Sequence, residues 1–369
     1  MCVWWGRRFR LPTANFSSPH AQWTRRTSRT CSESHSKTGA FPCTSMPMDR
    51  ETISAAALDC DHDRGAAIDG RARCDAMPHM TPRTSLSKRY ANETAMKPFL
   101  CKTCGTQFAP SIQSPPHCPI CEDERQFVGY GGQEWLTLPQ LQQTHRNAIR
   151  EEEPGLHSIL TEPDFAIGER AFLVQTNEGN LLWDCLALID PGTIERVRSL
   201  GGIRAIAISH PHFYTTMIEW SRAFGDVPIH LNARDQSWVM RPDAGIRFWN
   251  GDRFDLFGGL SLHWTGGHFD GFQVALWPDG AGGQGVLLAG DQPQVCADRR
   301  WVTFMYSYPN YIPLGPKTVE RVSSTLQALR FDRLYGAFPN RTILHDAKGA
   351  IARSAERYLR ALEPAFVVG

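Results

Sequence analysis

Short apolar runs, rich in β-branched and aromatic residues and separated by polar turns, make up much of the chain from about residue 156 onward. Runs of this length predict buried strands rather than helices. We predict strands at 158–161, 171–176, 180–186, 205–208, 228–231, 254–256, 260–265, 272–277 and 286–289. Apolar residues at helical spacing predict helices over 138–149 and 194–200, and others that begin near residues 216, 316 and 346. Thr216 and Glu219 have the spacing of a capping box at one of these starts. Two strand-rich halves, each followed by helices, indicate an α/β protein.

The segment 203–220, IRAIAISHPHFYTTMIEW, joins a predicted strand to a predicted helix. Its apolar run at 205–208 predicts the strand, and Pro211 ends the strand because proline cannot donate a hydrogen bond to a sheet. His210 and His212 follow the run directly. We therefore expect both imidazoles at the carboxyl end of a strand, where α/β proteins place their chemistry.

Further candidate metal ligands follow two later strands. His268 comes after a glycine pair at the end of the strand predicted at 260–265, and Asp291 follows the strand predicted at 286–289. Neutral imidazole is the commonest metal ligand in proteins, and a pair of imidazoles needs further partners to hold an ion. The pattern predicts one metal site built at several strand ends.

The order His-x-His, then Gly-His, then Gly-Asp resembles the metallo-β-lactamase superfamily, with its H-x-H-x-D-H loop and its later G-H and G-D motifs. The resemblance covers roughly residues 156–361. It implies an αββα sandwich and a metal bound by His210, His212, His268 and Asp291, with Asp291 as a ligand or as the catalytic base.

An early hairpin also fits the resemblance. The segment 179–184, GNLLWD, is similar to the family's hairpin that ends in an aspartate behind the metal loop. The resemblance implies that Asp184 orients the ligands from behind. Asp190 is the alternative for this role, although its context also suits the N-cap of the helix predicted at 194–200.

Three departures from the family pattern argue against a second metal ion. Tyr214 and Thr215 stand where the family has Asp and His, and the late turn 335–338 carries no histidine. His345 lies further on and reaches the site only if its loop folds back. We therefore expect a mononuclear site. Tyr214 either packs in the position of the lost second metal or acts as an acid and hydrogen-bond donor beside the remaining one.

Two C-x-x-C pairs form a second motif. Cys101 and Cys104 make one pair, and Cys118 and Cys121 make the other. Four thiolates from two tight turns complete a tetrahedral site, which in zinc proteins is structural because no coordination position stays open. The pattern resembles zinc ribbons and rubredoxins. Rubredoxin has glycine after its second pair, and here Glu122 follows, so we expect zinc rather than iron.

The first part of the chain differs in kind from the rest. Residues 1–95 are rich in Ser, Thr, Arg and Pro and show no sustained periodicity. We expect a tail without structure, translated from upstream of a start at Met96; the alternative is a transit peptide. The predicted organisation is this tail, a zinc ribbon over 96–130, a linker helix over 131–155 and a metallo-β-lactamase-like domain over 156–369.

The amino-acid composition indicates the cellular compartment and the kind of binding partner to expect. Eleven cysteines among 369 residues, with four in two tight pairs, do not form a disulfide framework and suit the cytoplasm, or the mitochondrion if the tail is a transit peptide. A net charge of +1 gives no electrostatic reason to expect nucleic acid or a membrane as partner. We expect a small-molecule substrate.

The sequence leaves several functions open. The leading one is a hydrolase in which a zinc-activated water attacks an ester, lactone, thioester or amide. The alternatives are a mononuclear non-haem iron oxygenase of the same fold and a degenerate domain that binds a metal or a partner without turnover. The aromatic segment 301–314 either covers the core or forms a wall of the substrate pocket.

Overall fold

Two β-sheets organise the part of the chain that the computed structural model describes, residues 95–363. The first sheet contains, side by side, β3 (Arg146–Glu153), β4 (Leu156–Glu162), β5 (Arg170–Thr176), β6 (Gly179–Trp183), β7 (Ala205–Ala207), β8 (Ile229–Asn232) and β9 (Ile246–Trp249). Pairing is antiparallel from β3 to β6 and parallel from β6 to β9. The expectations for the tail lie outside the described residues.

The second sheet comes from the later half of the chain. It contains, side by side, β10 (Arg253–Asp255), β11 (Ser261–Trp264), β12 (Gln273–Trp277), β13 (Val286–Gly290), β18 (Arg333–Gly336) and β19 (Thr342–Ile343). The pairs are antiparallel except for β13 with β18, which run parallel because helix α7 (Pro316–Gln327) lies in the connection between them.

Strands buried on both faces explain the continuous apolar runs in the sequence. In β5, Ala171 and Leu173 belong to the core shared with helices, whereas Phe172 and Val174 pack in the core shared with the second sheet. In a strand, successive side chains point to opposite faces, so both faces of β5 need apolar residues. The same alternation holds in β13.

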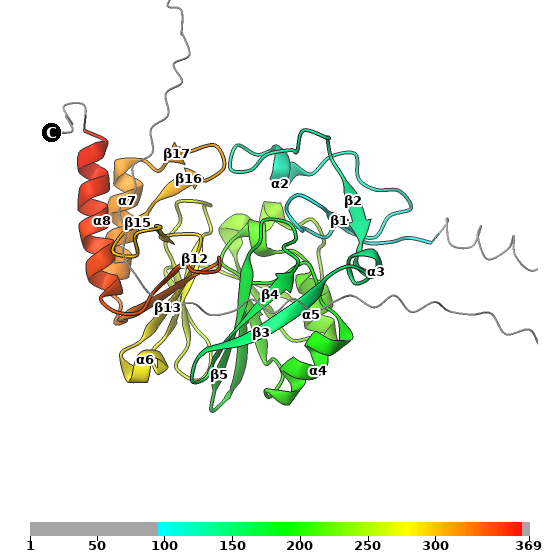
Figure 1. The fold of residues 1–369 in the computed structure, drawn as a ribbon, viewed down its shortest axis with the longest axis horizontal. Coiled ribbons are helices and arrows are strands. Elements are labelled where there is room, and N and C mark those ends of the chain that lie inside the picture. The colour runs from blue at the N-terminus through cyan, green and yellow to red at the C-terminus, as the bar shows by residue number, and fades with distance from the viewer. Residues whose placement is uncertain (1–94, 364–369) are drawn as a thin grey trace, which may run out of the picture. The chain divides into compact units, whose positions relative to one another are not determined.

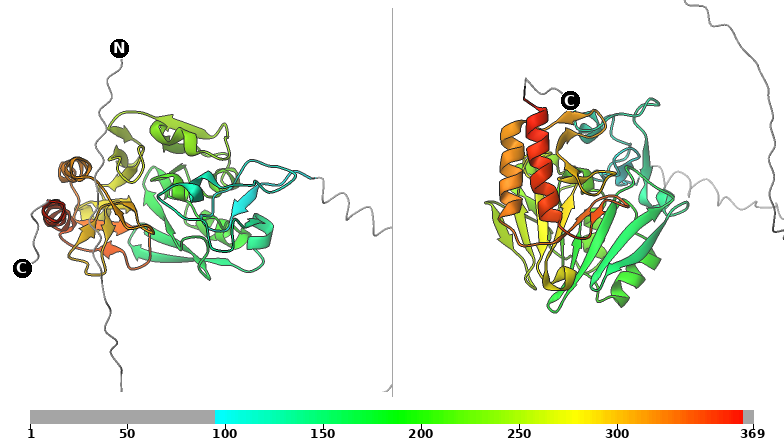
Figure 2. Two further views of the ribbon diagram at one scale, coloured as in Figure 1. Left: turned by 90° about the horizontal axis from the view of Figure 1, so that it is seen from above. Right: turned by 60° about the vertical axis from the view of Figure 1, so that its left-hand side comes forward.

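Helices cover the outer face of each sheet. Helices α4 (Pro191–Ser199) and α5 (Met217–Ala223) share a core with the first sheet, and α7 (Pro316–Gln327) and α8 (Ala347–Ala361) share one with the second. Figure 1 shows the two helix pairs on opposite sides of the strands, and Figure 2 shows α7 and α8 side by side. The αββα sandwich expected from the sequence is confirmed.

The cysteine pairs lie in a small unit that we call the cysteine module, residues 96–137. Strand β1 (Phe99–Cys101) pairs antiparallel with β2 (Trp135–Thr137), and the single turn α2 (Pro119–Glu122) begins directly after Cys118 and contains Cys121. Since β2 completes the sheet of β1, the module extends past residue 130, where we had expected it to end.

Two local expectations are wrong. The helix predicted over 138–149 is only one turn, α3 (Leu138–Leu141), because the chain then pairs with β4 as the edge strand β3. No linker helix therefore occupies 131–155 in the described structure. The capping box is also absent at α5, since the Thr216 hydroxyl donates to the Leu186 carbonyl and Glu219 pairs with Arg241.

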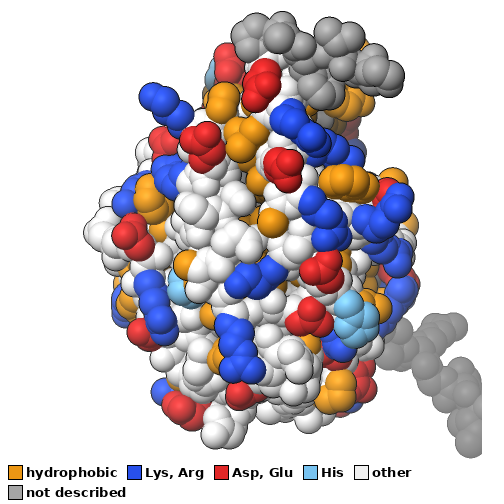
Figure 3. Space-filling view, turned by 90° about the vertical axis from the view of Figure 1, so that its left-hand side faces the viewer, with side chains coloured by type: hydrophobic (Ala, Val, Ile, Leu, Met, Phe, Trp, Pro, Cys, Tyr) orange, Lys and Arg blue, Asp and Glu red, His pale blue; other side chains and the backbone are white. Residues whose placement is uncertain are grey.

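Shorter elements connect these layers. They are α6 (Gly280–Gly283), β14 (Gln294–Val295), β15 (Val302–Thr303), β16 (Met305–Ser307), β17 (Ile312–Pro313) and short 3₁₀-helices at Pro211–Phe213 and Ala233–Trp238. Basic and acidic side chains are interspersed over the face that carries α7 and α8 (Figure 3). Among residues 95–363, no helix has both the length and the apolar character that crossing a membrane requires.

Candidate metal centres

Four predicted ligands meet where strands of both sheets end. His210 and His212 follow β7 of the first sheet, and His268 and Asp291 follow β11 and β13 of the second. Each offers a ligand atom within 4.8 Å of the others, and all four side chains are buried. Folding thus brings together residues up to 81 positions apart, since 291 − 210 = 81.

Neighbouring groups determine which imidazole nitrogens face the centre. His268 Nδ1 donates to the carbonyl of Tyr306 at 2.8 Å, which leaves its Nε2 as the free acceptor. Ser209 Oγ lies 2.9 Å from His210 Nδ1, so His210 Nε2 faces inward and lies 3.4 Å from Asp291 Oδ2. Such contacts fix the tautomer and the ring orientation of metal-binding histidines.

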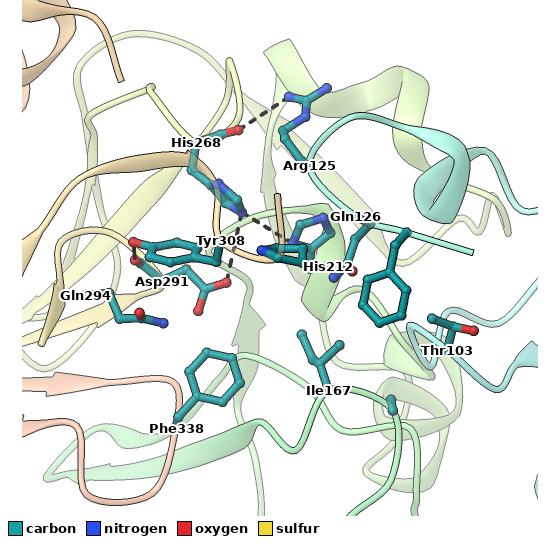
Figure 4. A pocket seen from close by; sticks show the side chains of 13 residues that line it. Thr103, Arg125, Gln126, Ile167, His212, His268, Asp291, Gln294, Tyr308 and Phe338 are labelled. Atoms are coloured by element: carbon teal, nitrogen blue, oxygen red, sulfur yellow. Dashed lines mark hydrogen bonds and ion pairs between the residues drawn. The ribbon is translucent and has the colours of Figure 1, made fainter. Parts of the chain in front are cut away.

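His212 completes the set through its other nitrogen. Its Nδ1 lies 3.3 Å from His268 Nε2, in the middle of the cluster (Figure 4). Among residues 95–363, His210 Nε2 and Asp291 Oδ1 face the cluster and are buried without a hydrogen-bond partner. Buried polar atoms are normally satisfied, so these orphaned atoms fit a site that holds an ion.

Burial controls the protonation of these groups. It lowers the pKa of His210 and of His212 well below the usual range and lowers the pKa of His268 to about 3. The imidazoles are therefore neutral at physiological pH, as metal ligands must be. Burial also raises the pKa of Asp291 to about 6, with His268 opposing that shift.

Asp184 supports the His210 loop from behind. Its Oδ1 accepts from the backbone N–H of Ser209 at 2.7 Å, and Ser209 contacts His210 in turn. The absence of a side chain at Gly290 leaves room for Ser209, since a Cβ at position 290 would lie 2.6 Å from Ser209 Oγ. Asp190 instead caps α4 by accepting from the N–H of Thr193. Of the two candidates for the supporting role, Asp184 has the required contacts.

A glutamine holds the loop that carries His268. Gln292 accepts from the N–H of His268 at 2.9 Å and donates to the carbonyl of Gly266. Gly267 has a positive φ of 107°, and a Cβ at this position would lie 2.6 Å from the Gln292 amide. The glycine pair noted in the sequence is thus required by the close packing of Gln292.

Two predicted site residues lie elsewhere. Tyr214 packs in the core between the first sheet and its helices and does not line the cavity beside the histidines, which favours the packing interpretation. His345 is exposed and contacts Asp332, so it does not join the ligand set. Its loop stays at the end of β19, while Ala337 and Phe338 occupy the turn where the family has its last histidine.

A cavity of about 360 Å³ opens onto the ligand cluster (Figure 4). His212, His268 and Asp291 lie at its floor, and Tyr308 lines it while donating to the carbonyl of Asp291. Sequence reasoning did not single out Tyr308, although it flagged the segment 301–314. Both interpretations of that segment apply, since Phe304 is core and Tyr308 is pocket wall.

The cysteine centre has the dimensions of a four-thiolate site. Cys101 Sγ lies 3.5 Å from Cys121 Sγ, and Cys104 Sγ lies 3.7 Å from Cys118 Sγ. A tetrahedron with zinc–sulfur bonds of about 2.3 Å has edges of about 3.8 Å. All four thiols are buried and unbridged, so this group could hold a metal ion.

Comparison with known proteins identifies a relative. The uncharacterized protein YmaE of Bacillus subtilis (strain 168) is 46% identical over 266 residues, which cover 72% of this chain and 96% of YmaE. The chain belongs to the YmaE family. No protein-family model matches the chain.

Solved structures with a similar fold are metallo-β-lactamases. A B3 enzyme with an active-site glutamic acid is 21% identical, with a TM-score of 0.41 over 59% of this chain and 88% of that chain. DIM-1 metallo-β-lactamase is 12% identical, with a TM-score of 0.46 over 58% of this chain and 98% of that chain. A Cronobacter sakazakii metallo-β-lactamase with a HARLDQ motif is 16% identical, with a TM-score of 0.42 over 60% and 95%.

Proposed function

We propose that this protein is a hydrolase that uses water to cleave an ester, lactone, thioester or amide, with one zinc ion held by His210, His212, His268 and Asp291. The observation that carries the proposal is the convergence of three neutral imidazoles and a carboxylate at the floor of a cavity with room for a small molecule. A zinc ion bound there supplies a Lewis acid that lowers the pKa of water to about 7.

The chain's own groups would handle the proton. Asp291 points one carboxylate oxygen, Oδ2, toward His210, while Oδ1 is free of other partners among the described residues. An ionised carboxylate with one oxygen free can accept a proton from the attacking water. Ile167 and Phe338 line the cavity and help to exclude bulk water from this step.

Turnover of a panel of acyl compounds tests the proposal. The panel contains p-nitrophenyl esters, a lactone, a thioester, an amide and a β-lactam. We expect hydrolysis of at least one ester or lactone, loss of activity with a chelator and recovery with zinc. Asp291→Asn should stay folded and lose about 10²–10⁴-fold in turnover, as expected for a positioned base.

Two other outcomes would replace the proposal. Bound iron, with a coloured protein and activity that requires oxygen, would indicate an oxygenase. A full metal complement with no turnover of any class in the panel would indicate a binding domain.

A further inference from the structure

The cysteine module supplies one wall of the cavity. Thr103 lies between the two cysteines of the first pair, and residues 125–127 begin four positions after Cys121. All of them line the same space as His212 and His268. In Figure 4, Thr103 and Gln126 lie on the same side of the cavity, with Thr103 farther from the ligand cluster. The module therefore takes part in forming the pocket.

Two hydrogen bonds attach this wall to the part of the chain that forms the second sheet and its loops. Arg125 Nη1 donates to the carbonyl of His268 at 3.3 Å. Asn310 Nδ2 donates to the carbonyl of Gln126 at 3.0 Å. Asn310 lies two residues beyond Tyr308, which contacts Asp291. The wall is thus connected directly to the His268 loop, and to Asp291 through the segment that carries Tyr308.

The cation on this wall is already paired. Arg125 is the only Lys or Arg that lines the cavity within residues 95–363. Its Nε and Nη2 donate to the Asp123 carboxylate at 2.5 and 2.9 Å, and its guanidinium lies 3.9 Å from the centre of the Phe269 ring. A guanidinium engaged in this way offers little to an incoming anion, which would lose its hydration without gaining a counter-ion there.

Gln126 is a polar group on this wall that is free to bind a ligand. The residue is 6% exposed, and its Oε1 is buried without a hydrogen-bond partner among the described residues. A buried amide in that state gains from a ligand that supplies the missing hydrogen bond. Gln294 adds a second neutral amide to the lining, and Phe127, Ile167 and Phe338 add apolar surface.

We propose that the cavity selects an uncharged acyl compound with an apolar chain, and that Gln126 of the cysteine module is the specificity-determining residue, whose Oε1 accepts a hydrogen bond from an N–H or O–H group of that compound. The inference rests on the proposed hydrolysis for the identity of the reaction. The preference for an uncharged ligand, by contrast, is inferred from the residues that line the wall of the cavity.

Binding without turnover gives the first test. The dissociation constant of hexanamide, an uncharged amide with an apolar chain, is measured on the zinc-loaded full chain by ligand-observed NMR. Gln126→Met removes the hydrogen bond at similar size and should weaken hexanamide binding by about tenfold. Gln143→Met, an exposed glutamine change, should leave it unchanged. No detectable binding to the wild type, or equal binding to the Gln126→Met variant, would overturn the proposal.

Selectivity in turnover gives the second test. The value of kcat/KM for p-nitrophenyl butyrate should exceed that for the mono-p-nitrophenyl ester of succinic acid by at least about tenfold, because the second ester carries a carboxylate at the end of a matched chain. Gln126→Lys adds a cation to the wall and should reduce that ratio by about tenfold. An anionic ester preferred by the wild type contradicts the proposal.

The two tests separate this inference from the proposed hydrolysis. Hexanamide binding that depends on Gln126, with no ester cleaved, would sink the hydrolase proposal and keep the pocket assignment. Suppose instead that esters are cleaved, but neither the ester selectivity nor the affinity for hexanamide changes when Gln126 is replaced. That result would keep the hydrolase proposal and overturn the pocket assignment.

Discussion

The fold holds the histidines of the candidate metal site through different contacts. His268 is held through its Nδ1 by a backbone carbonyl, and His210 is held through Ser209. Their free nitrogens point at the same space as Asp291. Since nothing but folding brings His268 to the histidine pair, it is the residue whose removal tests the shared site most directly.

His268→Ala should lose one metal ion per chain and keep the ion of the cysteine centre. Removing one of three or four ligands costs several kcal/mol of metal binding, on a scale where structural zinc binds with about 10–16 kcal/mol. Elemental analysis of the purified variant measures the loss. His345→Ala is the control, because His345 is exposed and lies outside the cluster. Loss of metal from the control with retention by His268→Ala would mean that the site uses other ligands.

Glu169 should make stability fall as the pH rises. Burial raises the pKa of its carboxyl from 4.5 to about 8, and the charge of Asp291 adds to that shift. Between these two pKa values the folded state keeps a proton that the unfolded chain releases. The contribution of Glu169 to the free energy of unfolding is therefore complete below the unfolded pKa and is lost as the pH approaches 8. From pH 6 to 8 the free energy of unfolding should drop by about 2 kcal/mol on this account.

Urea unfolding of Glu169→Gln at both pH values tests this expectation. The variant cannot ionise, so its stability should change less with pH than that of the wild type by about 2 kcal/mol. Glu320→Gln, an exposed change on α7, should behave like the wild type. Equal slopes for the wild type and Glu169→Gln would show that the carboxyl is ionised in the folded protein.

Among the structural elements, the contact between the cysteine module and the His268 loop depends on Arg125. Arg125→Met keeps the aliphatic stem, but the Asp123 carboxylate loses its guanidinium partner and the His268 carbonyl loses its donor. We expect a loss of about 2–4 kcal/mol in unfolding free energy, since one member of a buried pair is removed. Hydrogen exchange should also become faster in residues 266–270.

Arg300→Met supplies a matched control. Arg300 pairs with an aspartate two residues earlier, as Arg125 does, but its pair is exposed to solvent. We expect no measurable change in stability from this variant. A similar result for both arginines would mean that the module is not fastened through Arg125.

The sequence predicted the elements whose pattern is local. The buried strands appear as apolar runs, and His210, His268 and Asp291 each follow one of them, so these candidate ligands could be selected by their position along the chain. The strand β3 was missed because Leu138, Leu141 and His145 have helical spacing, and its pairing with β4 overrides that local preference.

Contacts between distant segments could not be predicted in this way. Arg125 and His268 are 143 positions apart, and Gln126 and Asn310 are 184 apart. Neither pair has a periodicity or a motif that links it. The cysteine module was therefore expected to be a separate structural unit, although its residues line the cavity.

For the whole molecule, the two clusters predict the metal content. We expect two metal ions per chain, one at the cysteine centre and one at the histidine centre. Elemental analysis with protein quantitation measures the ratio. Replacing Cys101 and Cys104 with serine should remove one ion and leave the other. Three ions per wild-type chain would mean that a second ion binds beside the histidines despite Tyr214 and Thr215.

The origin of the ligands from both sheets has a mechanical consequence. His210 and His212 belong to the first sheet's loops, whereas His268 and Asp291 belong to those of the second. An ion held by all four ligands would connect the two halves, so the halves could separate only if the ion were released. Each tenfold rise in free ion above its dissociation constant would then add about 1.4 kcal/mol to stability. A cell short of the ion would hold a protein whose halves part more readily, and proteases would cut it sooner.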